Sequence, residues 1–225
     1  LEDGNTYYAQ GGIASVTNPW DNFEKHIDDT IDAGAGLCNR DVVEKVVKNA
    51  PEQIMEVVKW GVNFDRDEDG YFDLHKEGGH SEFRILHHKD NTGMEIQTSL
   101  IKAIRRNPNI DVYDNHFTIE ILTQHHLGKI ITNNTPNIEC YGAYILDLQS
   151  NVVHTFLSRV TMMSTGGIGC IYKTTANPLV ATGDGIAMVS RAKGVVKGME
   201  FVQFHPTALY KPGVHPSFLI TEAMR

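Results

Sequence analysis

The segment Met162-Met163-Ser164-Thr165-Gly166-Gly167-Ile168-Gly169 says most about the fold, because an apolar run leads directly into a cluster of glycines. Many nucleotide-binding sites are built this way, with a strand that ends in glycines so that bare backbone can approach a phosphate or a ribose. The full Gly-x-Gly-x-x-Gly fingerprint is absent, since Tyr172 stands where its last glycine would be, and the rest of the chain also lacks it. The segment indicates an α/β protein whose phosphate-binding loop lies elsewhere or does not exist.

A second glycine segment, Ala181–Met188, places Asp184 between two glycines just before an apolar helical stretch. An aspartate at such a position accepts hydrogen bonds from sugar hydroxyls, or it simply caps the helix. The residues alone favour the cap.

A third segment, Asn5–Ala14, contains the adjacent pair Gly11-Gly12. Adjacent glycines allow a close approach to a flat ligand that a Cβ would block. The side chains of Thr6 and Gln10 are able to hydrogen-bond a polar heteroaromatic edge. Without further context, a Gly-Gly pair is more often only a turn.

Polar groups suited to a carboxylate ligand occur at two further places. The segment Glu77-Gly78-Gly79-His80 presents an acid and an imidazole on a flexible turn, and Gln203–Thr207, with His205, precedes the pair Thr221-Glu222. Histidine and threonine supply donors, and a neutralised glutamate also supplies one. The alternative interpretations are a surface loop for the first and a structural histidine before proline for the second.

The periodicity of apolar residues predicts helices first and strands afterwards. A helix is expected over 21–33, with Asp21 as its cap and Gly34 at its end. Another begins near Asp41, with four valines facing inward and Pro51 opening a third helix that runs to Gly61. A further helix is expected over 93–106. Short strands are expected at 110–113, 117–122, 129–132, 141–148, 153–157 and 159–164, some of them paired antiparallel.

The composition excludes several classes of protein. The chain of 225 residues has 28 acidic and 20 basic side chains, so its net charge of −8 argues against a nucleic-acid partner. No apolar run reaches the length of a membrane span, and the first residues do not resemble a signal peptide, so a cytoplasmic protein is expected. The three cysteines have no close pairing and are expected to be reduced thiols. No metal site is expected from His80, His87 and His88 or from His125-His126, because no zinc-binding motif surrounds them.

Taken in order, these segments resemble the succinate dehydrogenase, fumarate reductase and L-aspartate oxidase flavoprotein family over essentially the whole chain. The family pattern Ala-Gln-Gly-Gly, Thr-Gly-Gly-x-Gly, Thr-x-Asn-Pro, Thr-Gly-Asp-Gly, Gln-x-His-Pro-Thr and Thr-Glu is present from Ala9 to Glu222. The resemblance implies an α/β fold with α+β character. Residues 1–198 would form an FAD-binding domain of the fumarate reductase flavoprotein type that lacks its N-terminal dinucleotide-binding strand, and residues 199–225 would begin a capping domain.

The resemblance also implies the site residues. Those expected to contact FAD are Asn5, Thr6, Tyr7, Tyr8, Ala9, Gln10, Gly11, Gly12 and Asp184, and those expected to bind substrate are Glu77, His205, Thr221 and Glu222. Asn5 stands where membrane-bound succinate dehydrogenases carry a histidine bonded to flavin, so non-covalent FAD is expected. The family's proton-transfer arginine would lie beyond Arg225, which leaves no catalytic residue within the chain.

Glu77 indicates the branch of the family, because succinate dehydrogenases resemble one another in having Phe-Gly-Gly-Gln where this chain has Glu77–His80. An anionic side chain there suits a substrate with an ammonium group, which a charge-assisted hydrogen bond would favour by about 1.5–3 kcal/mol. The resemblance therefore implies oxidation of L-aspartate to iminoaspartate, with oxygen or fumarate as acceptor. That reaction is the first step of quinolinate and NAD biosynthesis, with possible hand-over to quinolinate synthase, and the chain alone is expected to be inactive. The alternatives are a piece of a soluble fumarate reductase and a non-enzymatic nucleotide-binding domain.

Overall fold

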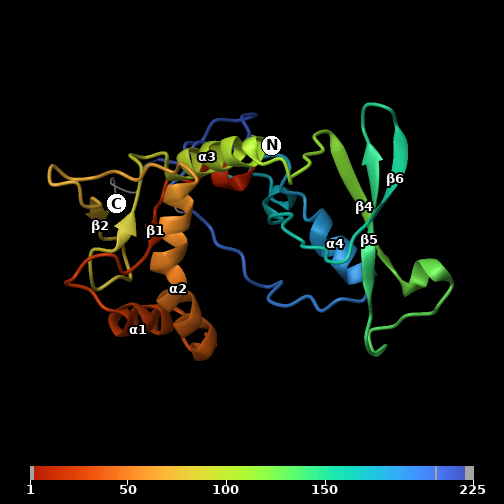
Figure 1. The fold of residues 1–225 in the computed structure, drawn as a ribbon, viewed down its shortest axis with the longest axis horizontal. Coiled ribbons are helices and arrows are strands. Elements are labelled where there is room, and N and C mark those ends of the chain that lie inside the picture. Colours follow the sequence, from red (N-terminus) through yellow and green to blue (C-terminus); the bar gives the residue numbers. More distant parts are fainter. Residues whose placement is uncertain (1–2, 206, 221–225) are drawn as a thin grey trace. The chain divides into compact units, whose positions relative to one another are not determined.

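The computed structural model describes residues 3–205 and 207–220, and the chain divides into two compact units (Figure 1). The first unit ends at Ile110, and the second runs from Asp111 to Ile220. The predicted domain boundary near residue 198 stays a prediction. Each unit is described by itself.

The first unit combines three helices with a small antiparallel sheet. Its elements, in chain order, are the short 3₁₀ helix η1 (Asn5–Tyr8), β1 (Ile13–Ala14), α1 (Phe23–Ala33), α2 (Arg40–Lys59), β2 (Leu74–His75), β3 (Ile85–Leu86) and α3 (Thr92–Arg106). The strand order is β1-β3-β2, so β3 lies in the middle. Leu86 of β3 pairs with Ile13 on one side and with Leu74 on the other.

The core of this unit lies between α2 and β3. Ile54, Val62, Phe64 and Leu86 form a buried cluster, and partly buried apolar residues from β1, β2 and α3 pack around it. Burial of each such side chain contributes about 1.5–3 kcal/mol, so this cluster stabilises the packing of the sheet against α2. The expected helix over 93–106 is confirmed as α3.

Two expectations about the helices are wrong. Asn22, not Asp21, caps α1, and its side chain accepts the Lys25 N–H at 2.9 Å. Asp21 is instead held by the buried guanidinium of Arg84. Pro51 does not open a new helix but lies inside the continuous α2.

Because α2 is one continuous helix, only some of its valines point into the core. Val47 is buried with Ile54, seven residues later on the same face, whereas Val42 and Val46 are 56% and 63% exposed. A helix that is buried along one stripe leaves residues on its other faces outside. The four valines were therefore wrongly expected to face inward together.

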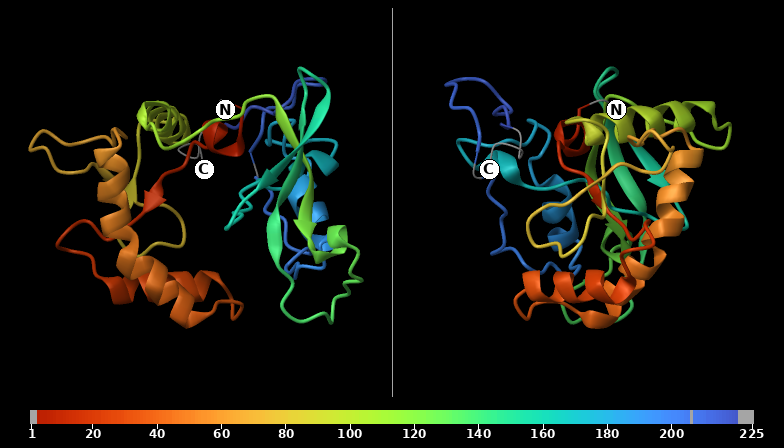
Figure 2. Two further views of the ribbon diagram at one scale, coloured as in Figure 1. Left: turned by 45° about the vertical axis from the view of Figure 1, so that its right-hand side comes forward. Right: turned by 90° about the vertical axis from the view of Figure 1, so that its left-hand side faces the viewer.

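The second unit is built on a three-stranded antiparallel sheet with the order β4-β5-β6 (Figure 2). Its elements are β4 (His116–Thr123), the 3₁₀ helix η2 (Gln124–Leu127), β5 (Cys140–Asp147), β6 (Val152–Leu157), the 3₁₀ helix η3 (Gly169–Ile171) and α4 (Asp184–Arg191). The helix α4 contacts β4, and Arg191 Nε donates to Glu120 Oε2 at 2.6 Å. The predicted antiparallel pairing is confirmed.

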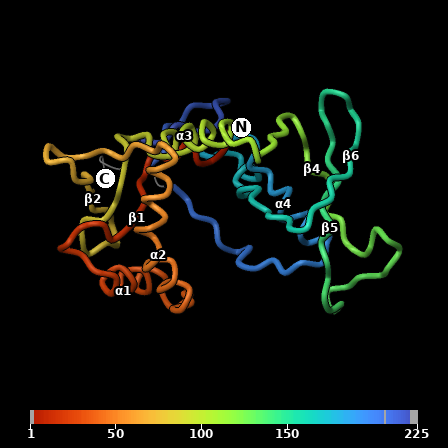
Figure 3. The backbone as a smooth tube through the Cα atoms, viewed as in Figure 1, coloured from red at the N-terminus to blue at the C-terminus, as the bar shows by residue number. Residues whose placement is uncertain are grey.

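Three expected strands, at 110–113, 129–132 and 159–164, are not formed. Ile130, Val160 and Met162 are each more than 80% exposed, so these β-branched and apolar stretches have no neighbouring strand to pair with. After α4 the described residues up to Ile220 follow an irregular path, in which Ala208 and Leu219 form an isolated antiparallel bridge (Figure 3).

The three cysteines are free thiols, as expected. Among the described residues, no helix combines the length and the apolarity needed to cross a bilayer.

Candidate functional site

In the second unit, the glycines of two motifs allow the motifs to pack tightly on each other. A Cβ added to Gly185 would lie 1.7 Å from Thr165 Oγ1, and one added to Gly183 would lie 2.7 Å from Ile168 Cδ1. Gly183 also has a φ of +79°, which disfavours any residue with a Cβ. The two glycines around Asp184 are therefore required by contact with the Thr165–Gly169 segment.

This packing leaves Asp184 exposed on the first turn of α4. Gly183 is the N-cap, and the cap has no side-chain hydrogen bond, so the interpretation of Asp184 as a capping residue is wrong. Its Oδ2 accepts the Thr182 hydroxyl at 2.5 Å instead. A negative charge in the first turn of a helix is favourable, and it leaves carboxylate lone pairs available for a ligand hydroxyl.

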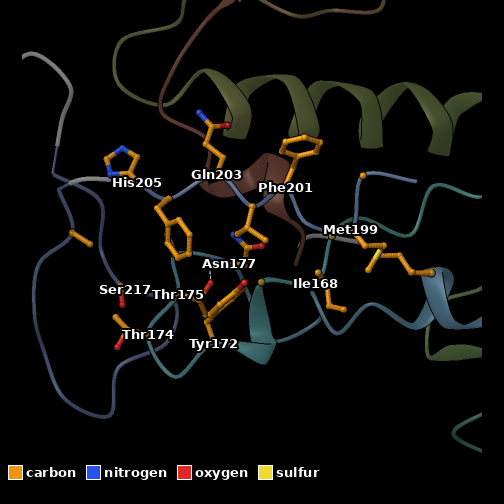
Figure 4. A pocket seen from close by; sticks show the side chains of 18 of the residues that line it. Ile168, Tyr172, Thr174, Thr175, Asn177, Met199, Phe201, Gln203, His205 and Ser217 are labelled. Atoms are coloured by element: carbon orange, nitrogen blue, oxygen red, sulfur yellow. Dashed lines mark hydrogen bonds between the residues drawn. The ribbon is translucent and has the colours of Figure 1, made fainter. Parts of the chain in front are cut away.

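A cavity of about 480 Å³ lies in the same unit, between the Gly167–Asn177 region and the chain after α4 (Figure 4). Its lining includes Tyr172, Asn177, Phe201, Gln203 and His205. This volume is typical of a small-molecule site, and the mixture of aromatic rings with amides and an imidazole is typical of one too. The cavity brings residues of the neighbouring Thr-Gly-Gly-x-Gly and Thr-x-Asn-Pro motifs together with the Gln-x-His motif, which lies about 25 residues further along the sequence.

Within this cavity, His205 has one ring nitrogen committed to the backbone. The Thr207 N–H donates to His205 Nδ1 at 3.3 Å. Because Nδ1 accepts, the neutral ring carries its proton on Nε2, which makes Nε2 a donor suited to a carboxylate. Ring packing between Tyr172 and Phe204, with centroids 5.6 Å apart, forms the adjacent wall.

In the first unit, the loop Asn5–Gly12 that is predicted to bind FAD is mostly exposed, and its Gly12 packs against β3. A Cβ at Gly12 would lie 2.3 Å from Leu86 O, so this glycine lets the loop run directly against β3. Gly93, at the start of α3, donates its N–H to Ala9 O at 3.0 Å. The loop is therefore attached at two points, while Asn5, Thr6, Tyr8, Ala9 and Gly11 remain exposed.

The structure brings Glu77 to this loop. A Cβ added at Gly11 would lie 3.9 Å from Glu77 Oε1, although the two residues are far apart in the sequence. Glu77 begins a turn that is closed by the His80 N–H donating to Glu77 O at 3.2 Å. A predicted substrate residue and a predicted cofactor loop thus lie side by side.

A buried ionic network holds the end of this turn. Arg84 is fully buried and donates to both oxygens of Asp21, at 2.7 and 2.8 Å, and to Asp29 Oδ2. Asp29 Oδ2 also accepts the backbone N–H and the hydroxyl of Ser81, both at 2.8 Å. Burial raises the pKa of Asp29, but the hydrogen bonds from Ser81 and Arg84 lower it by more, to about 2.

Not every predicted residue falls within this description. Thr221 and Glu222 lie outside the described residues, and the roles predicted for the FAD and substrate residues stay predictions. The sequence did not lead us to predict the ionic network around Arg84. The available signal was the position of this arginine directly before the apolar pair Ile85-Leu86.

Known flavoproteins resemble this chain over nearly its whole length. The family described as an FAD binding domain matches residues 2–225. An L-aspartate oxidase from Nicotiana tabacum chloroplasts is 46% identical over 99% of the chain, and one from Acinetobacter baylyi is 45% identical over 100%. The chain spans 34% and 40% of the lengths of these two relatives.

Among solved structures, a quinol fumarate reductase from E. coli matches 97% of the chain with a TM-score of 0.81 and 29% identity, and the chain covers 34% of it. The chain therefore belongs to the FAD binding domain family, with L-aspartate oxidases as homologues along its whole length and the fold of the fumarate reductase flavoproteins.

Proposed function

We propose that the chain is part of an FAD-dependent L-aspartate oxidase, which oxidises L-aspartate to iminoaspartate with oxygen or fumarate as acceptor. The observation that carries the proposal is the carboxylate of Glu77 beside Gly11 of the FAD loop. An anion at that position suits a substrate with an ammonium group and disfavours succinate, which has only carboxylates. Such an enzyme supplies iminoaspartate for quinolinate and NAD biosynthesis, with hand-over to quinolinate synthase.

The residues present fit FAD. The largely exposed loop Asn5–Gly12 offers backbone and side-chain polar groups, and among the described residues a Cβ at Gly11 would come within 4 Å of Glu77 alone, which supports the approach of a flat ring there. Asp184 is exposed and positioned to accept a sugar hydroxyl. Asn5 offers no imidazole for a covalent bond, which supports dissociable FAD. When bound, FAD accepts the hydride that leaves Cα of the substrate.

The protein's own contribution is binding and orientation. Glu77 accepts a hydrogen bond from the substrate ammonium, and the Nε2–H of His205 donates to a substrate carboxylate. Thr221 and Glu222 are proposed to add further carboxylate contacts. The arginine that transfers a proton is proposed to lie beyond Arg225, so the chain alone is inactive.

We also propose that residues 1–198 form the FAD-binding part of the enzyme and that residues 199–225 begin a capping domain. Support comes from the change from regular elements to an irregular path after α4 (Asp184–Arg191).

The test is the substitution Glu77→Gln in the full-length enzyme. Loss of a charge-assisted hydrogen bond worth about 1.5–3 kcal/mol lowers kcat/KM for L-aspartate about 10- to 150-fold. Fumarate reduction by the same variant, driven by a chemical reductant, changes little, because fumarate carries no ammonium group. The matched control is Glu68→Gln, the same change at an exposed acid of the first unit.

Equal losses in both reactions would contradict the assignment of Glu77 to the ammonium group. Reduction of the flavin by succinate and not by L-aspartate would place the enzyme with the fumarate reductases, and a full-length protein that takes up no flavin would favour the non-enzymatic alternative.

A further inference from the structure

Three potential metal ligands surround the Leu74–Leu86 pair in the first unit. Asp73 and His75 flank Leu74, and His87 follows Leu86, its partner across the sheet. Because successive side chains along a strand point to opposite faces, residues that flank a core-facing pair project to the other face. Leu74 and Leu86 pack into the core, and ligand atoms of Asp73, His75 and His87 all lie within 4.8 Å of one another.

The ring of His87 is buried without a hydrogen bond to any described residue. Its side chain is only 8% exposed, yet neither Nδ1 nor Nε2 has a hydrogen-bond partner in the part of the chain that the structure describes. The nearest acidic oxygens are Asp65 Oδ2, 3.4 Å from Nδ1, and Asp73 Oδ2, 3.7 Å from Nε2. Leaving a buried polar group unsatisfied costs about 1–3 kcal/mol, so an imidazole in this state is suited to gain a ligand.

The positions of the two carboxylates give the two nitrogens of His87 different roles. Histidines that bind metal commonly donate their other N–H to a carboxylate, which fixes the ring and raises its basicity. Asp65 is placed to do this at Nδ1. Nε2 is then left facing Asp73, with the ring of His75 stacked beside it at a centroid distance of 3.6 Å.

We propose that Asp73, His75 and His87 bind a divalent transition metal ion of the zinc type, with Asp65 orienting His87. Two imidazoles and a carboxylate are a donor set that zinc prefers, with a water molecule in the fourth position. The proposal is independent of the oxidase reaction, because it uses none of the residues assigned to FAD or to the substrate.

Binding requires a local movement that the structure permits. Bonds of about 2.0–2.2 Å place tetrahedral zinc ligands roughly 3.3 Å apart, so the ligand atoms must approach by about 1.5 Å. The rings of His75 and His87 are inclined by only 21°, and a metal lies in the plane of each imidazole that binds it, so one ring must turn. His75 and Asp73 are exposed and free to rotate, whereas buried His87 stays in place.

The experiment titrates Zn²⁺ into the full-length protein by calorimetry and follows Co²⁺ by its visible absorption, which is intense for tetrahedral sites. We expect one ion per chain at this site. Removing a carboxylate that orients a metal-binding histidine typically lowers metal affinity about 10- to 100-fold, so Asp65→Asn should bind Zn²⁺ more weakly by that factor. His75→Ala removes a ligand itself and should weaken Zn²⁺ binding by at least about 100-fold. His154→Ala, at an exposed histidine of β6, is the matched control and should bind normally.

Several results would overturn the proposal. It is wrong if the unmodified protein binds no Zn²⁺, or if His75→Ala binds as tightly as the unmodified protein. Unchanged affinity in Asp65→Asn would remove the orienting role of Asp65. Because His75 and Asp65 are not core residues, circular dichroism of both variants serves to confirm that lost binding does not reflect unfolding.

Discussion

Replacing Arg84 by methionine removes the cation that contacts both Asp21 and Asp29 in the ionic network. Asp21 has a fully buried side chain, and both of its oxygens accept hydrogen bonds from the guanidinium. Breaking a buried pair by removing one partner typically costs about 3–5 kcal/mol.

The free energy of unfolding of the Arg84→Met variant at pH 7 is therefore expected to be about 3–5 kcal/mol lower than that of the unmodified protein. Urea unfolding of both proteins at pH 7, followed by circular dichroism, measures this difference.

The control is Arg40→Met, because Arg40 makes its ion pairs with Asp28 and Glu44 at the surface, where it is half exposed. Its effect should be far smaller, because surface ion pairs contribute about 0–1 kcal/mol. A cost below about 1 kcal/mol for Arg84→Met would refute the reasoning that the buried Asp21 side chain needs Arg84 as its partner.

Two further predictions concern stability. Gly183→Ala should destabilise the second unit by about 1–2 kcal/mol because its backbone is left-handed, and by about 1–3 kcal/mol more because the new methyl group clashes with Ile168. The control is Gly36→Ala, where φ is +87° and no described atom lies within 4 Å of the added Cβ. In the same thermal unfolding assay this variant should show the cost of the left-handed backbone alone. The lowered pKa of Asp29 contributes stability that is fully present above the ordinary pKa of 3.8 and is lost as the pH falls towards about 2. Asp29→Asn should flatten this part of the acid unfolding curve, and an unchanged curve would mean that the hydrogen bonds from Ser81 do not favour the ionised form.

Local patterns were sufficient for several elements. The helix over 93–106 was predictable because its apolar residues recur along one stripe and Asn107-Pro108 ends it. The three strands of the second sheet were predictable from short β-branched runs between polar turns. Similar runs near Ile130 and Val160 gave the same prediction and formed no strand, because strand formation needs a partner that a local pattern does not contain.

The sequence by itself determined that this is a member of an FAD-binding family, through the order of its glycine, threonine and histidine motifs. It also supplied the acidic side chain of Glu77, from which the prediction of a cationic group on the substrate was made. Only the tertiary structure decided which residues meet: Glu77 beside Gly11, Arg84 between Asp21 and Asp29, and His75 with Asp73 around His87. The physical reason is that each of these contacts depends on strand register and helix packing, which are set by burial of the whole core and not by any local run of residues.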